Sequence, residues 1–244
     1  MTLITAVLSG CASEPVVPSV ETKRGDRVGL LVDIGEGPLH THVGTTVFNN
    51  FEKKYPYRWN LDAAAADTLS KALSAAGFTV VNLENEGMSH ASVGTLLVAD
   101  GEKWKVAPGK EQLVRDLLDR KGLKALIALK ETRVTTALEC AGGPCTERHA
   151  NASGLYTRSF LGSTRYHAVA AYGLNVYLLA PLADLAKGDP LRTILRMPVV
   201  PIGSYPAPAK FDNLTEAELA PARDAVLDFT RQIGVEVARA LNPK

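Results

Sequence analysis

The chain has few cysteines, little net charge and no long apolar run. Only three of its 244 residues are cysteines, and 27 Lys and Arg nearly balance 26 Asp and Glu, which leaves a net charge of +1. So small an excess gives no basic footprint for nucleic acid, and we expect no nucleic-acid partner. No stretch approaches the roughly 20 consecutive apolar residues that a membrane-spanning helix needs. With 46% apolar and 22% charged residues, the composition is that of a globular chain with a large core.

The first cysteine, Cys11, follows a short apolar segment at the N-terminus. Ser9 and Gly10 are small, as signal peptidases require next to their cleavage site. Leu8-Ser9-Gly10-Cys11 resembles the lipobox of bacterial lipoproteins at all four positions. The resemblance implies cleavage before Cys11 and acylation of its sulfur and its new amino group, which together anchor a protein stably in a membrane. Because Ala12 rather than an aspartate follows, it also implies sorting to the outer membrane, facing the periplasm.

One feature of this N-terminus departs from a signal peptide. A basic residue normally precedes the apolar region, but no Lys or Arg precedes Cys11. We therefore expect the translation start to lie upstream, and a chance match to the lipobox is the alternative. The lipoprotein hypothesis divides the chain into a signal peptide (1–10), a lipidated tether rich in Pro, Ser and charge (11–26) and a single domain (27–244).

The other two cysteines are Cys140 and Cys145, which flank Ala-Gly-Gly-Pro. In an oxidising periplasm, two thiols across such a turn predict a local disulfide, worth about 2 kcal/mol for so short a ring. A redox dithiol and half of a metal site are the alternatives. A redox motif has two residues between its cysteines and opens a helix. A metal site needs two more ligands, and His149 is the nearby candidate.

The first half of the chain alternates apolar strands with amphipathic helices. Asn60 predicts the start of a helix and Gly77 its end, and Asp100-Gly101 predicts a hairpin between 95–99 and 103–106. Three strands joined by two helices predict a β-α-β-α-β core with a partly parallel sheet. The expected segments are strand 27–33, helix 61–76, strand 78–83, helix 111–121 and strand 125–129.

The second half has the period-two pattern of antiparallel strands. We expect strands at 134–138, 154–161, 166–180 and 191–199, and a further β-like run at 43–48 within the long connection 38–59. A final apolar face predicts a C-terminal helix, with Thr215 and Glu218 at capping-box spacing and a restart at Pro221. The predicted fold class is α/β with α+β character in the C-terminal half: a mixed sheet with added antiparallel strands and a C-terminal helix.

The order of elements is similar to that of a group of envelope α/β domains. The segments that carry the resemblance are Val28-Gly-Leu-Leu-Val32, the "helix, glycine, strand" phrase at 67–81, and the strand at 125–129 followed by long sheet strands. The group includes the N-terminal domain of the Tol–Pal system's β-propeller protein, the penicillin-binding-protein activator lipoproteins and the curli-secretion lipoprotein. The resemblance implies an adaptor or assembly factor and supplies no catalytic residues. A likeness of fold does not by itself establish function.

His40-Thr41-His42 is the clearest candidate for chemistry. In an extended segment, residues i and i+2 share one side, so His40 and His42 can act together as ligands of a metal ion. Asp33 and Glu36 precede them and can supply carboxylates. This pattern predicts a metal-dependent hydrolytic site. The alternative is a polar loop with two ordinary histidines.

A run of aromatic and basic residues follows this pair. Such a composition is enriched at protein interfaces, and it predicts a partner-contact surface; the alternative is a loop folded over the sheet with Trp59 in the core. The candidate contact residues are Phe51, Tyr55, Tyr57, Arg58 and Trp59.

Taken together, the sequence favours an outer-membrane-anchored periplasmic lipoprotein whose domain binds an envelope protein partner without catalysis and without a cofactor. A metal-dependent hydrolase using His40, His42 and Asp33 is one alternative. A sensor or carrier that binds a small molecule or glycan at the strand ends near residues 33–42 is the other.

Overall fold

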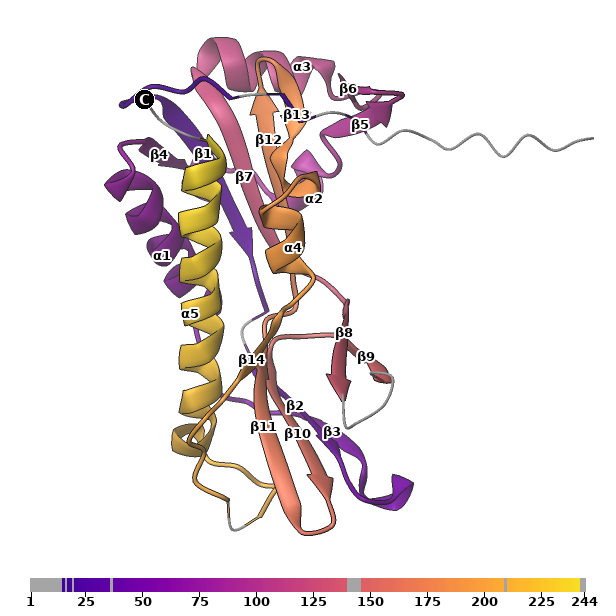
Figure 1. Ribbon diagram of the computed structural model, residues 1–244. Coiled ribbons are helices and arrows are strands. Elements are labelled where there is room, and N and C mark those ends of the chain that lie inside the picture. The colour runs from indigo at the N-terminus through magenta and orange to yellow at the C-terminus, as the bar shows by residue number, and fades with distance from the viewer. Residues whose placement is uncertain are drawn as a thin grey trace, which may run out of the picture.

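The protein is built from two five-stranded sheets placed end to end, with one long helix running beside both (Figure 1). The structure, a computed structural model, describes residues 15, 17–18, 20–35, 37–139, 146–208 and 210–241. Both sheets mix parallel and antiparallel pairs, and helices occupy about a third of the chain. The predicted α/β class is therefore confirmed.

The first sheet contains the predicted β-α-β-α-β core. Its central strand pairs in parallel with a strand on either side, and two antiparallel strands extend it at one edge. The inner strands are continuous apolar runs because both faces of the sheet are covered. Its order is β13 (Leu182–Asp184), β12 (Tyr172–Leu179), β7 (Leu123–Glu131), β1 (Arg27–Asp33) and β4 (Thr79–Asn82).

One face of the first sheet packs against the helices α1 (Leu61–Ala75) and α5 (Glu216–Leu241). Alternate strand residues such as Leu30, Ile127 and Val176 point into this layer. The two helices approach closely because Gly234 has no side chain: a Cβ there would lie 2.9 Å from the Cβ of Ala72.

The other face of the first sheet carries a smaller apolar core, which includes Leu31, Leu126 and Tyr177. Its cover comes from short elements and from the predicted hairpin. The predicted helix 111–121 forms as one α-helical turn followed by a π-helical segment. The covering elements are η2 (Glu84–Glu86), α2 (His90–Val93), β5 (Leu97–Asp100), β6 (Lys103–Val106), α3 (Glu111–Arg115) and η3 (Asp116–Arg120).

The second sheet is built from segments that leave the ends of the first. Its central pair β2–β10 is parallel, and its other pairs are antiparallel. The parallel pair requires a glycine at position 154, because a Cβ there would lie 2.0 Å from the carbonyl oxygen of Leu39. Its order is β14 (Val199–Pro201), β11 (Ser163–Val169), β10 (Gly154–Phe160), β2 (Leu39–Val43) and β3 (Phe51–Lys54).

A hairpin of β8 (Val134–Glu139) and β9 (Thr146–Ala150) lies against the second sheet, where Ala150 joins a small apolar cluster with Tyr156 and Val169. The remaining short helices are η1 (Val47–Asn49), η4 (Leu185–Lys187) and α4 (Leu191–Leu195).

Several expected elements differ in the structure. The expected strand 166–180 is two strands, β11 and β12, in different sheets, because the chain crosses between the sheets near Ala170. The expected strand 191–199 is mainly the helix α4, and the run 43–48 is a bend and the helix η1 between two strands. A period-two pattern cannot distinguish one long strand from two strands joined by a tight crossing.

The last helix is continuous, so the expected restart at Pro221 is wrong. Its capping box is as predicted: Glu218 N–H donates to Thr215 Oγ1, and Thr215 N–H donates to a carboxylate oxygen of Glu218 at 2.7 Å. At the start of α1, by contrast, Asn60 has a positive φ of 49° and makes no side-chain cap. Pro221 lies near the start of α5 and removes one backbone hydrogen bond from a helix of 26 residues, so the helix continues through it.

The folded body begins before Arg27. Val20 lies in the main core, and the hydroxyl of Thr22 donates to the carbonyl of Leu241 at 2.8 Å. Residues 20–26, which we expected in the tether, therefore pack on the body. Cys11, Cys140, Cys145 and Glu36 lie outside the described residues, so lipidation and the disulfide stay predictions. No helix in the described ranges is both long and apolar enough to cross a membrane.

Candidate functional site

The two histidines of the sequence motif lie together on one face of β2, as their spacing predicts. Both are buried, and both bond to the same hydroxyl on the neighbouring strand β10. His40 Nε2 and His42 Nδ1 each lie 2.7 Å from Thr157 Oγ1. A hydroxyl has one proton to donate, so at least one of the two rings donates its N–H to Thr157.

Aromatic rings enclose the histidine pair on the side facing α5. The ring of His42 stacks on Phe51 of β3 at 5.1 Å, and Phe211, from the loop before α5, lies 5.0 Å from it. His40 meets Phe51 edge-on at 5.1 Å. The pair therefore serves as part of a packed layer between the second sheet and the loop that leads into α5.

Burial keeps both histidines neutral at ordinary pH. Removal from water, reinforced by the nearby His42 and Lys53, lowers the pKa of His40 to about 4, and the carbonyl of Phe211 opposes this only in part. Burial also lowers the pKa of His42, as does the guanidinium of Arg158. His40 Nδ1 is buried, and among the described residues it makes no hydrogen bond of normal geometry, although the Phe211 carbonyl lies near the ring.

The structure does not assemble the predicted metal site. Within the described residues, no three His, Cys, Asp or Glu side chains come together in a way that could hold a metal ion. Asp33 is exposed at the end of β1 in the first sheet, whereas the histidine nitrogens face Thr157. As a ligand set, His40, His42 and Asp33 are therefore not supported.

Asp33 instead belongs to a group of carboxylates at the carboxyl ends of the parallel strands, where the sequence placed a small-molecule site. Burial raises the pKa of Glu84, and the nearby Asp62 and Asp33 raise it further. Asp62 accepts a hydrogen bond from the backbone N–H of Ile34. Carboxylates gather at this edge, and that of Asp62 holds the backbone of the chain as it leaves β1.

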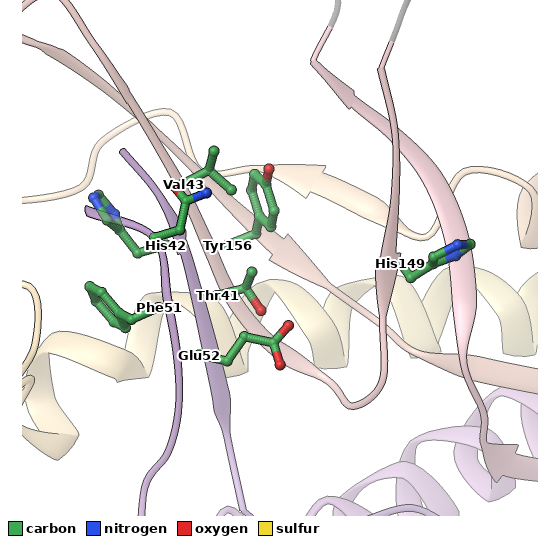
Figure 2. Close-up of a pocket in the computed structure, with 8 residues that line it drawn as sticks. Thr41, His42, Val43, Phe51, Glu52, His149 and Tyr156 are labelled. Atoms are coloured by element: carbon green, nitrogen blue, oxygen red, sulfur yellow. The ribbon is translucent and has the colours of Figure 1, made fainter. Parts of the chain in front are cut away.

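A shallow hollow of about 410 Å³ lies beside the end of β2 and is lined from both faces of this strand, by Thr41 on one and His42 on the other. Thr41 lies between Glu52 on β3 and Tyr156 on β10, in register with both. Figure 2 shows the side chains of Thr41 and Glu52 close together and His149 standing apart on β9. His149 Nδ1 lies 2.8 Å from Thr135 Oγ1 of the same hairpin. The hollow offers a carboxylate and a hydroxyl to a polar group.

Of the five predicted contact residues, Tyr55 and Trp59 are buried in the main core. The hydroxyl of Tyr55 accepts from Leu214 N–H, and that of Tyr57 donates to the Leu214 carbonyl, both at 3.1 Å. Phe51 is half-buried against the histidines, and Arg58 is exposed. The alternative reading, with Trp59 in the core, is therefore the one the structure supports.

Four of the large apolar side chains that are exposed in the described part of the chain lie elsewhere, in a group that sequence reasoning missed. Val47 and Phe48 of η1 are 75% and 92% exposed, and Phe160 and Leu161 of the β10–β11 turn are 55% and 79% exposed. We call these four residues the apolar tip. The sequence pattern predicts a β-like run for Val47 and Phe48 and the end of a strand for Phe160 and Leu161, so it did not predict that they would be exposed.

The two loops of the apolar tip follow neighbouring strand ends. β2 and β10 end together, and the guanidinium of Arg158 donates to the carbonyls of Gly44 and of Ser159, the latter at 2.9 Å. Leu161 and Gly162 both have positive φ, 46° and 82°, as a two-residue hairpin turn requires. A leucine in this backbone region is strained by about 1–2 kcal/mol. The turn therefore keeps a bulky apolar side chain in water at a cost in free energy.

No family model matches the chain, and the search of curated proteins returned no match. The function therefore has to be argued from the lipobox-like segment and from the geometry described above.

Proposed function

We propose that this chain is a lipoprotein of the bacterial outer membrane, anchored through Cys11, whose periplasmic body binds another envelope protein without catalysing a reaction. The observation that carries the proposal is the apolar tip. Soluble monomeric proteins seldom expose several large apolar side chains together unless a partner covers them.

The geometry supports an anchor at one end of the molecule and a contact at the other. Thr22 bonds to Leu241, the last residue of α5, whereas Lys53 of the second sheet donates to the carbonyl of Asp212, just before α5 begins. The 26 residues of α5 separate these two points by about 39 Å at 1.5 Å per residue. The second sheet, which carries the tip, therefore extends away from the N-terminal segment (Figure 1).

The charge behind the tip indicates the chemistry of the partner. Arg165 lies on β11, two positions after the strand begins and close behind the turn of the tip, and it is exposed. An apolar groove with a carboxylate at its rim would cover the tip and meet this guanidinium.

The histidines support a structural role more than a hydrolytic one, because the nitrogens that face β10 share the Thr157 hydroxyl. A hydrolase would need one of them free to move a proton. Zinc and iron analysis of the purified protein, together with His40→Gln and His42→Gln, tests this. Bound metal that both variants lose would overturn the non-catalytic proposal.

A second function is favoured by the hollow beside the tip. Thr41, Glu52 and Asn50 can hydrogen-bond the hydroxyls of a glycan, which is the sensor alternative. Titration with soluble cell-wall glycan fragments, followed by the Thr41 and Glu52 signals in NMR, tests it. Saturable shifts confined to the hollow would establish this function in place of protein binding.

The anchor and the contact are tested separately. Cys11→Ala should release the protein from the membrane fraction into the soluble periplasm; retention would contradict the lipoprotein assignment.

For the contact, Phe48→Ser with Leu161→Ser should remove a partner recovered by affinity purification from solubilised envelope. Met197→Ser, at a 59% exposed methionine outside the tip, is the matched control and should leave recovery unchanged.

A further inference from the structure

A second pocket lies in the half of the molecule away from the tip, between the β5–β6 hairpin and the segment η4–α4. Its volume is about 410 Å³, within the range of small-ligand sites. Apolar side chains from the hairpin, among them Leu97 and Trp104, form one wall, with Pro15 beside them. Neither the histidine pair nor the tip includes any of these residues.

The facing wall is cationic. Lys187, Arg192 and Arg196 all line the pocket. Lys187 and Arg196 are exposed, and Arg192 lies 3.8 Å from a carboxylate oxygen of Asp189. Ammonium and guanidinium groups donate hydrogen bonds and accept none, so this wall is built for an acceptor.

Trp104 contributes its ring to the apolar wall. Its Nε1 is buried and has no hydrogen-bond partner among the described residues, so the indole presents apolar surface to the pocket. The pocket therefore combines three cations with an apolar wall.

We propose that this pocket binds an amphipathic anion: a single acyl chain that carries a carboxylate or phosphate head. The chain would lie along Leu97 and Trp104, and the head would meet Lys187 and Arg196. Such a group can come from a free fatty acid or from a phospholipid in a bilayer. The inference does not depend on the docking function, because it concerns different residues.

The two tryptophans allow a direct test. The chain has only Trp59 and Trp104, and Trp59 is 4% exposed in the main core. Bromine quenches indole fluorescence only at close range. In the full chain carrying Trp59→Phe, monomeric 12-bromododecanoate should quench Trp104 saturably. In the full chain carrying Trp104→Phe, the same probe should leave the fluorescence of Trp59 unquenched. If Trp59→Phe does not fold, comparing the quenching of the parent chain with that of Trp104→Phe gives the contribution of Trp104.

Charge and source are tested by variants and probes. Lys187→Ala with Arg196→Ala should weaken binding of the carboxylate at least tenfold, and 12-bromododecanol should bind at least tenfold more weakly than the acid. Arg165→Ala, an exposed arginine elsewhere, is the matched control and should bind as the parent does. Thermal unfolding of each variant checks that it is folded.

Three results would overturn the proposal: no saturable quenching of Trp104, quenching by acid and alcohol alike, or an unchanged affinity in the double variant. Quenching by vesicles of brominated phosphatidylglycerol, without any by the monomer, would show contact with a bilayer surface instead of a pocket for one chain, and would also overturn it.

Discussion

The two sheets of this protein use their interiors differently. The inner strands of the first sheet are mostly aliphatic and are covered on both faces. The second sheet buries two histidines and Thr157 among aromatic rings and leaves the apolar tip in water. The difference indicates that the first sheet supplies the stability on which the second presents its surface.

A polar junction joins the two sheets. Glu131, at the end of β7, accepts from Ser153 N–H at 3.1 Å, and Ser153 Oγ accepts from Ala171 N–H at 3.0 Å. Burial raises the pKa of Glu131. Because the junction is hydrogen-bonded and α5 packs on both sheets, we expect them to unfold in one transition, with local opening confined to the second.

The largest effect is expected at the parallel pair of the second sheet. Gly154→Ala would drive its Cβ into the carbonyl of Leu39 and should lower the free energy of unfolding by more than about 3 kcal/mol. Urea denaturation measures this. Gly203→Ala, where nothing lies within 4 Å of the added carbon, is the control. Equal stability of the two variants would contradict the close approach.

The matching substitution for the first sheet is Gly234→Leu. A larger side chain there would push α5 away from Ala72 and Leu69, and overpacking of this kind costs about 1–3 kcal/mol. Hydrogen exchange should show lost protection in α1 and α5 before the second sheet. The neighbouring Val235→Ala, at an exposed position, should change little. Loss of protection first in β10 and β11 would contradict the assignment of stability to the first sheet.

Acid should destabilise the fold through the second sheet. The folded pKa of His40 is about 4, below its ordinary 6.5, so the unfolded chain binds the extra proton first. The contribution of the neutral His40 ring to the free energy of unfolding is fully present above pH 6.5. It is lost as the pH falls toward 4, by up to about 1.4 kcal/mol per pH unit.

Melting temperatures between pH 7 and pH 4 measure this loss, and His40→Gln should flatten the slope in that range. His149→Gln, at an exposed residue of the β8–β9 hairpin, is the control. A slope that His40→Gln leaves unchanged would show that other groups cause the acid sensitivity.

The smallest expected change is a gain in the free energy of unfolding. Leu161→Asn places a residue that tolerates positive φ in the turn and should stabilise the fold by about 1 kcal/mol. The same change should weaken partner binding, because it removes one side chain of the tip. Thermal unfolding and affinity purification of the same sample test both; a gain in stability with unchanged recovery would exclude Leu161 from the contact.

The sequence predicted the first sheet well because its information is local. Continuous apolar runs such as Val28–Val32, Gly77 and Asp100-Gly101 determine strand, helix end and hairpin without reference to distant residues. The division into two sheets was not predictable in this way, since it depends on where the chain crosses at Ala170 and on the close approach of Gly154 to Leu39. The histidine spacing predicted a shared face correctly, but Thr157, 115 residues from His42, decides what that face does.

The central claim is that the tip is the contact surface of the anchored protein. A photoreactive phenylalanine analogue placed at position 48, and in a second strain at position 197, tests it in living cells. We expect one discrete cross-linked protein from position 48, which is lost when Leu161→Ser is added, and none from position 197. Equal cross-linking from both positions, or none from position 48, would contradict it.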